Sequence, residues 1–294
     1  MAIDMEHEKA YSPSSWSKRF DSTELLSYFN DYAVKVTNDC RKKIACKLDV
    51  PYGSTDNTKY DIYGINLSND VPVFIFIHGG YWQECSKQYS GFHIETLVSK
   101  GIKVFNIGYD LCPTVTLSDI VAEIKLAIEK IVKLCYAQGT KTIWIGGHSA
   151  GAHLAACILY DSEWQSEMAQ ENCLKLIKGI ILIGGIYSLE PLLTTSYNIP
   201  LKLTKKEIET LSFNHVNVKY PILLNNIKAL IVVGECDAPK FIEESKNYSK
   251  KLIDMVDQVE FILYRNNTDH FDIMEKLMDP TNGLSKKIIT NILQ

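Results

Sequence analysis

The chain has 294 residues, of which 46% are hydrophobic and 22% charged, and its net charge is −4. A chain of this size can bury a substantial core, and no repeat or linker divides it, so we expect a single domain over residues 1–294. Lys and Arg are dispersed along the chain, which argues against nucleic acid or an anionic membrane as a partner.

Apolar runs rich in Val, Ile and Phe predict buried strands of a parallel sheet, and amphipathic segments between them predict helices. Such alternation is typical of an α/β fold with helices on both faces of a mostly parallel sheet. The expected elements are less regular antiparallel edge strands at 44–50 and 59–65, central strands at 71–77, 102–107, 142–146, 179–183, 229–233 and 259–263, and helices at 91–100, 117–138, 150–160 and 239–254.

A Gly-Gly loop follows the third of these strands, in the segment HGGYW at 78–82. Serine attack on a carbonyl creates an oxyanion, which needs preorganised N–H donors about 3 Å away. Adjacent glycines let backbone amides face outward, and H-G-G after the third strand is typical of lipases and esterases. We expect Gly79, Gly80 and Ala150 to form the oxyanion hole, the alternative being an ordinary turn.

The side chains that flank these glycines have less certain roles. Tyr81 and Trp82 are candidate substrate-binding residues that would form an apolar wall for a flat molecule, with core packing as an equal alternative. We expect His78 to anchor the loop by hydrogen bonds and not to transfer protons.

The nucleophile is predicted from the segment GHSAG at 147–151, which lies between a strand and a helix. This G-x-S-x-G pattern places Ser149 on a tight, strained turn, where side chains at Gly147 or Gly151 would collide with neighbouring elements. The alternative is a small-residue turn with Ser149 as a helix cap. His148 and His153 are more consistent with structural roles.

The alternation of strands and helices fails at 187–226, which we interpret as a cap insertion over the carboxyl edge of the sheet, where ligands bind in such folds. The next strand leads into a loop with two acidic residues. Hydrolases of this fold order their triad as Ser, acid, His. We choose Asp237 as the acid because it lies just before Pro239, the expected start of a helix; Glu235 is the competitor.

The base is predicted to be His270, because it is the histidine that follows Asp237 after the last strand. It would take the proton of Ser149 and later give it to the leaving group, while Asp237 holds the imidazole. A metal site built on Asp269, His270 and Asp272 is the alternative, without a further ligand cluster to support it. We expect no metal and no organic cofactor.

The cellular location is inferred from the N-terminal residues and the cysteines. Residues 1–10 mix charged side chains without an apolar run, unlike a secretory signal, and the apolar stretches are too short to span a bilayer. The eight cysteines lie mostly in or beside apolar segments. We expect reduced, buried thiols in a cytoplasmic protein.

The chain resembles the kynurenine formamidase (arylformamidase) family of α/β hydrolases. The matching segments are HGGYW at 78–82, YDLCP at 109–113, GHSAGAHL at 147–154 and DHFD at 269–272. The resemblance implies hydrolysis of N-formylkynurenine in tryptophan breakdown, with Ser149, Asp237 and His270 as the triad and the Gly79/Gly80 loop as the oxyanion hole. Departures lie in the cap, at Ser188 and at 213–215.

Two other hypotheses stay open at this point. A broad carboxylesterase related to hormone-sensitive lipase would share the H-G-G and G-x-S-x-G segments, and a binding module could keep the fold without catalysis. A small-molecule aryl formamide is the partner that the resemblance implies. The sequence leaves the oligomeric state open, a homodimer included.

Overall fold

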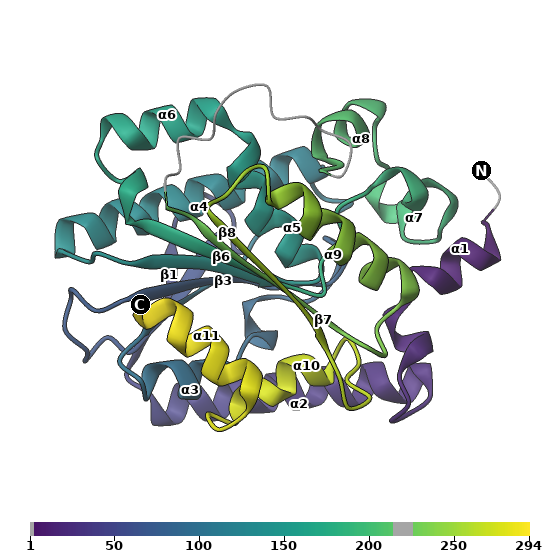
Figure 1. Cartoon of the computed structure of the whole chain (residues 1–294), viewed down its shortest axis with the longest axis horizontal. Helices are drawn as coiled ribbons and strands as arrows, with labels where there is room; N and C mark the ends of the chain where they lie inside the picture. Colours follow the sequence, from purple (N-terminus) through teal and green to yellow (C-terminus); the bar gives the residue numbers. More distant parts are fainter. Residues whose placement is uncertain (1–2, 214–225) are drawn as a thin grey trace.

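Eight strands form one sheet, and helices cover both of its faces (Figure 1). The computed structural model describes residues 3–213 and 226–294. The strands are β1 (Cys46–Pro51), β2 (Lys59–Tyr63), β3 (Val73–Ile77), β4 (Lys103–Ile107), β5 (Ile143–His148), β6 (Ile177–Ile183), β7 (Lys228–Gly234) and β8 (Gln258–Tyr264). They run in the order β1-β2-β4-β3-β5-β6-β7-β8, in which β3 to β8 are parallel and β2 is antiparallel to both neighbours.

The predicted α/β fold with a mostly parallel sheet is confirmed, and so are the two antiparallel edge strands. The six central strands begin and end within two residues of their expected bounds. All five residues of β3 are buried, because helices cover both faces of the sheet. Strands that are buried on both faces appear in the sequence as continuous apolar runs. The central strands are therefore the most predictable part of the chain.

The helices are α1 (Met5–Ala10), α2 (Ser22–Lys43), α3 (Ile94–Val98), α4 (Leu117–Gln138), α5 (Ala150–Ala156), α6 (Ser162–Gln170), α7 (Asn198–Leu201), α8 (Lys205–Leu211), α9 (Pro239–Leu252), α10 (Asp272–Glu275) and α11 (Gly283–Leu293). The helix predicted at 117–138 is confirmed at both ends. A Thr116–Asp119 capping box starts it, and Gly139 in the left-handed conformation ends it. The helix predicted at 150–160 is divided: α5 ends at Ala156 and a 3-10 turn follows.

Alternate residues of β3 face two different cores. Ile75 and Ile77 pack in the core that contains the apolar face of α4, whereas Phe74 and Phe76 pack in the core that contains α2 and α11. Figure 1 shows α4 and α5 on one side of the sheet and α2, α3 and α11 on the other. The sheet therefore separates two apolar layers.

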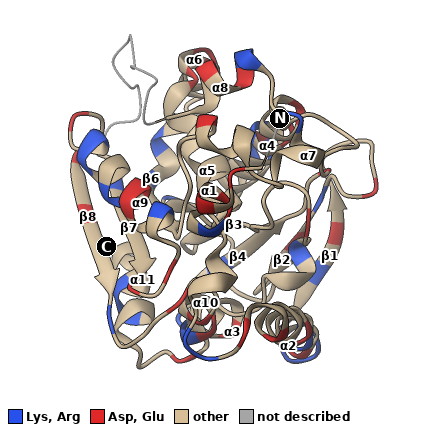
Figure 2. Ribbon diagram, turned by 90° about the vertical axis from the view of Figure 1, so that its right-hand side faces the viewer, with Lys and Arg blue, Asp and Glu red and all other residues tan. Residues whose placement is uncertain are grey.

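The N-terminal helices are elements that the sequence reasoning missed. Asp21 caps α2 by accepting hydrogen bonds from the backbone N–H groups of Thr23 and Glu24. The helix buries one stripe, made of Leu25, Phe29, Ala33, Val36, Thr37 and Cys40. The helix also contains both acidic and basic residues (Figure 2). Its overall composition is therefore polar, and the period of its apolar residues is easily overlooked. None of the described helices is long and apolar enough to cross a membrane.

Candidate active site

A cavity of about 230 Å³ lies at the carboxyl ends of β3 and β5. Register brings these ends together, because Ile77 of β3 pairs with Gly147 of β5. The residues after both strands therefore meet at one point of the sheet edge. The cavity lining combines this edge with the N-terminal region: Pro13, Ser14, Leu26, Phe29, Asn30, Phe76, His78, Gly79, Gly80, Tyr81, Glu84, Cys85, Tyr89, Ser90, Phe92, His148, Ser149, Tyr197, His270, Phe271 and Met274.

Ser149 occupies the turn between β5 and α5 with a φ of 58°. A non-glycine residue rarely adopts this conformation, and here the surrounding packing imposes it. A Cβ on Gly147 would lie 2.2 Å from the carbonyl oxygen of Gly151, and one on Gly151 would lie 2.1 Å from that of Ile77. The turn therefore admits only glycine at both positions, as the sequence motif predicts, and it leaves Ser149 facing the cavity.

The glycine loop after β3 lies directly against this turn. A Cβ on Gly79 would approach the Cβ of Ser149 to 2.9 Å, and one on Gly80, whose φ is 105°, would approach the carbonyl oxygen of Glu84 to 2.2 Å. The first N–H groups of a helix lack intrahelical partners, and Ala150 begins α5. Gly79 and Ala150 thus adjoin Ser149, and Gly80 lines the same cavity.

His78 and Tyr109 hold the glycine loop in place. His78 Nδ1 donates a hydrogen bond to the carbonyl of Gly79 at 2.8 Å, and its ring stacks on Tyr109 with a centroid separation of 4.1 Å. The hydroxyl of Tyr109 donates to the carbonyl of His78 at 2.9 Å. Burial lowers the pKa of His78 to about 4, so the ring is neutral at pH 7. This contact joins the HGGYW and YDLCP segments in one structural unit.

His270 lies beside Asp237, and both are buried. His270 Nδ1 donates to Asp237 Oδ2 at 2.7 Å, while Asp237 Oδ1 accepts from the N–H of Ala238. Glu235, the competing acid, instead accepts from the N–H of Asn267 at 2.5 Å and pairs with Arg265. The geometry therefore favours Asp237 over Glu235 as the partner of the imidazole, and His270 lines the same cavity as Ser149.

His148 connects the nucleophile turn to the loop that carries His270. Its Nε2 donates to the carbonyl of His270 at 2.8 Å, and the two rings are 4.4 Å apart. Burial and the neighbouring His270 lower the pKa of His148 well below its usual value, so it serves as a neutral donor. His148, at the variable position of the G-x-S-x-G motif, thus connects the serine turn to the loop that carries His270.

Tyr81 and Trp82 have different positions. Tyr81 lines the cavity, stacks on Tyr197 at 3.9 Å and donates its hydroxyl to the carbonyl of Tyr11 at 2.5 Å. Trp82 is fully buried and packs edge-on against His153, so of the two alternatives open to it, core packing fits its position. Direct substrate contact is consistent with Tyr81 and is not consistent with Trp82.

Several lining residues come from parts of the chain in which the sequence suggested no individual site residue. Pro13 and Ser14 lie before α2, and Leu26, Phe29 and Asn30 lie on it. Tyr197 comes from the segment 187–226, of which 214–225 lies outside the described residues. The capping residue Asp21 and the apolar stripe of α2 could have predicted this helix. No local motif, however, indicates that the helix lies beside the catalytic edge of the sheet.

The carboxylates beside His270 have cationic partners of their own. Asp269 accepts from Arg19 Nε at 2.8 Å, and Asp272 pairs with Lys276. Within residues 3–213 and 226–294, no group of three or more His, Cys, Asp or Glu side chains is arranged to hold a metal ion.

The sheet order, the strained serine turn and the glycine loop at the carboxyl edge define the class of the protein: the chain is an α/β hydrolase. The BD-FAE family profile matches residues 60–252. Kynurenine formamidase of Salmo salar is 33% identical and covers 97% of this chain and 95% of its own length; that of Drosophila melanogaster is 29% identical, with 95% and 94% covered. The chain belongs to the kynurenine formamidase family.

Solved structures agree with the α/β-hydrolase class. A candidate thioesterase from Silicibacter sp. TM1040 has a TM-score of 0.78 at 26% identity, covering 99% of this chain and all of its own. An esterase from Pyrobaculum calidifontis has a TM-score of 0.67 at 14% identity, covering 100% and 98%. At that identity the second comparison supports the fold alone.

Proposed function

We propose that this chain hydrolyses N-formylkynurenine to kynurenine and formate, with Ser149 as nucleophile, His270 as base and Asp237 as its partner. The observation that carries the proposal is the 2.7 Å contact between His270 and Asp237 at a cavity that Ser149 also lines. Membership of the kynurenine formamidase family supports the choice of an aryl formamide as substrate.

The first step forms an acyl-enzyme. The hydroxyl oxygen of Ser149 attacks the formyl carbon while His270 Nε2 takes the hydroxyl proton. The oxyanion accepts hydrogen bonds from the amides of the Gly79/Gly80 loop and Ala150. The C–N bond then breaks as His270 returns the proton to the departing arylamine, general acid help worth about 100- to 10,000-fold.

The second step releases formate. Water gives a proton to His270 and attacks the formyl ester on Ser149, and collapse of the new tetrahedral species returns the proton to the serine oxygen. Asp237 keeps the Nδ1 proton in place and stabilises the imidazolium in both steps. The residues carry out the whole cycle with water as the second reactant.

The cavity suits a flat aromatic leaving group. Its wall includes the rings of Phe29, Phe76, Phe92 and Tyr81, which offer apolar and edge-to-face contacts to an arene. Only a hydrogen accompanies the carbonyl of a formamide, so the acyl side needs no large pocket. The wall residues thus serve the aniline part of the substrate and not the acyl part.

The test is a comparison of formate release from N-formylkynurenine with hydrolysis of short p-nitrophenyl esters. We expect efficient formamide cleavage, and its loss in Ser149→Ala with unchanged circular dichroism. Ser14→Ala is a matched control, because Ser14 is another cavity hydroxyl and is bonded to Ser22 at 2.6 Å. Fast ester hydrolysis with an intact formamide would instead favour a carboxylesterase.

The proposal includes a cytoplasmic location. All eight cysteines are free thiols, six of them buried, which suits a reducing compartment. Fractionation of cells that express the full chain, followed by immunoblotting, tests this part separately from the activity.

A further inference from the structure

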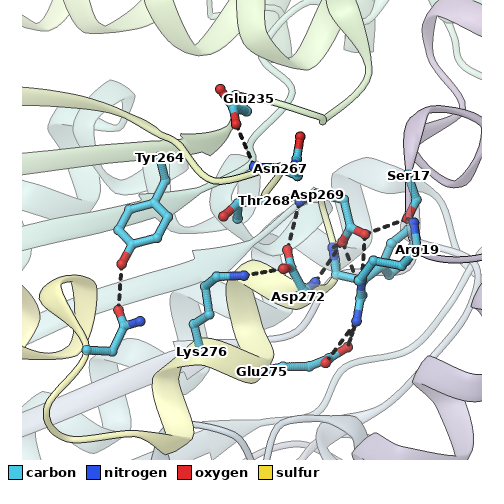
Figure 3. A network of polar contacts seen from close by, with 12 residues as sticks. Ser17, Arg19, Glu235, Tyr264, Asn267, Thr268, Asp269, Asp272, Glu275 and Lys276 are labelled. Carbon is cyan, nitrogen blue, oxygen red and sulfur yellow. Dashed lines mark hydrogen bonds and ion pairs between the residues drawn. The ribbon is translucent and has the colours of Figure 1, made fainter.

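The N-terminal segment contacts the loop that carries His270 at one buried carboxylate. Asp269, which directly precedes His270, is fully buried. Its Oδ2 accepts from Ser17 Oγ at 2.6 Å and from Arg19 Nε at 2.8 Å, and its Oδ1 accepts from a second Arg19 nitrogen at 3.2 Å. The two residues that bind it lie about 250 positions earlier in the chain, and Figure 3 shows them converging on it.

The same carboxylate organises the turn around His270. Asp269 Oδ1 also accepts from the N–H groups of Phe271 and Asp272 at 2.8 Å each, and the N–H of Asp269 donates to Asp272 Oδ1 at 2.7 Å. Residues on both sides of His270 are therefore tied to each other through Asp269. A shift of this side chain would move the backbone of His270 with it.

Arg19 extends the contact past the turn. One of its terminal nitrogens binds both carboxylate oxygens of Glu275, at 3.1 and 3.0 Å, so the guanidinium spans Asp269 and the last residue of α10. Its own position is supported by the rings of Phe20 and Tyr28, 5.7 and 5.9 Å away. Burial alone would raise the pKa of Asp269, but Arg19 and Ser17 lower it, which keeps the carboxylate ionised.

We propose that Arg19 is a positioning residue for His270: together with Ser17 it clamps Asp269, and through Asp269 it holds the imidazole beside Asp237, in the cavity that Ser149 also lines. The inference rests on the proposed role of His270 as base. A buried carboxylate that loses its cation cannot stay in place unchanged, because the charge would be uncompensated. The turn would rearrange, and a displacement of about 1 Å at a catalytic group can cost roughly 100-fold in rate.

The experiment compares Arg19→Ala with Lys18→Ala in the full chain. Lys18 is the adjacent cation of the same segment and reaches the same loop, but it binds the exposed amide of Asn267 and not Asp269. For Arg19→Ala we expect kcat to fall roughly 10- to 100-fold at a nearly unchanged KM, whereas Lys18→Ala keeps the parent kcat. Equal kcat values for Arg19→Ala and the parent would overturn the clamp, and so would equal losses in the two variants.

Chemical rescue separates positioning from a general effect on folding. Millimolar guanidinium chloride should restore a substantial part of kcat to Arg19→Ala, whereas urea, which has the same planar shape without the charge, should not. Failure of guanidinium to raise kcat in a variant with parent-like circular dichroism would count against the proposal. If Arg19→Ala does not fold, Arg19→Lys and Ser17→Ala replace it. The ammonium group of a lysine cannot bind the carboxylates of Asp269 and Glu275 together. An unchanged kcat in both replacement variants would therefore overturn the clamp.

Each variant is also assayed with p-nitrophenyl acetate and labelled with a fluorophosphonate at Ser149. The parent protein could be labelled at Ser149 and cleave the ester without cleaving N-formylkynurenine. The proposed substrate would then be wrong, but the rate of labelling would still test the clamp. In that case slower labelling of Arg19→Ala than of Lys18→Ala supports the clamp, and equal rates overturn it.

Discussion

The two halves of the cavity are built in different ways. One half, which we call the sheet half, consists of loops that follow strands and carries Ser149, the glycine loop and His270, with Asp237 behind His270. The other, the covering half, comes from the N-terminal segment, α2 and the segment around Tyr197. In the sheet half, close approaches to neighbouring atoms exclude a side chain at four glycines, Gly79, Gly80, Gly147 and Gly151. In the covering half, side chains meet through ring stacking and hydrogen bonds. The proposed chemistry is thus assigned to the rigid half and substrate fit to the adaptable one.

Asp237→Asn, in the sheet half, is expected to lower kcat more than any change in the covering half. The amide would present either an oxygen without charge or an N–H group to His270 Nδ1, which disturbs the tautomer that the 2.7 Å contact selects. We predict a fall in kcat of about 10,000-fold with little change in KM. Glu235→Gln is the matched control, because it neutralises the other carboxylate of the same loop. Comparable losses in both variants would show that the acid is misassigned.

Gly79→Ala tests whether the sheet half tolerates a single methyl group. Its Cβ would lie 2.8 Å from the carbonyl oxygen of His148 and 2.9 Å from Ser149 Cβ, so the loop must move away from the nucleophile. Loss of an oxyanion donor costs about 100- to 1,000-fold in kcat, and we expect a loss in that range. Gly101→Ala is the control for an added methyl group without a steric clash, since its Cβ would meet nothing within 4 Å, even though its φ of 78° disfavours alanine. Turnover by Gly79→Ala at the parent rate would refute the oxyanion assignment.

Tyr197→Ala addresses the covering half. The ring of Tyr197 lines the cavity and stacks on Tyr81 at 3.9 Å. An aromatic contact between this wall and the arene of the substrate would contribute about 0.5–1.5 kcal/mol to binding. We therefore expect KM for N-formylkynurenine to rise roughly 2- to 10-fold while kcat stays close to the parent value. Ile199→Ala, at an exposed position of α7, should leave both constants unchanged. A kcat loss as large as that of Gly79→Ala would remove the distinction between the halves.

The sheet half could be predicted from the sequence, whereas most of the covering half could not, for a physical reason. Ser149 and Gly79 closely follow continuous apolar strands, and His270 lies a few residues after the largely apolar strand β8. The local sequence therefore indicates both the strand and the loop after it. Phe29 contributes to the cavity through packing between residues distant in sequence, and α2 carries only an amphipathic stripe. The pairing of Asp269 with Arg19 is likewise a long-range contact. No pattern within a short window can specify it.

Glu244 links the N-terminal segment to the start of the segment 187–226 and gives a test by pH. This residue of α9 accepts from the N–H groups of Tyr187 and Ser188, where the segment 187–226 begins, and from the hydroxyl of Tyr11. Burial raises its pKa to about 7, although these hydrogen bonds oppose the shift. The folded protein therefore holds a proton that the unfolded chain releases near its ordinary value of 4.5. Stability should fall as pH rises between these two values.

Glu244→Gln should remove this pH dependence with the smallest effect on turnover. A glutamine can still accept from both amides, and its NH₂ group can donate to the Tyr11 hydroxyl. Chemical denaturation of both proteins at pH 5 and pH 7.5 should show the parent losing on the order of 2 kcal/mol relative to the variant. Glu243→Gln, next in the chain and paired with Lys240 at the surface, should follow the parent. If the free energy of unfolding of Glu244→Gln falls as much as that of the parent between pH 5 and pH 7.5, the carboxyl of Glu244 is already ionised at pH 5 and does not titrate in this range.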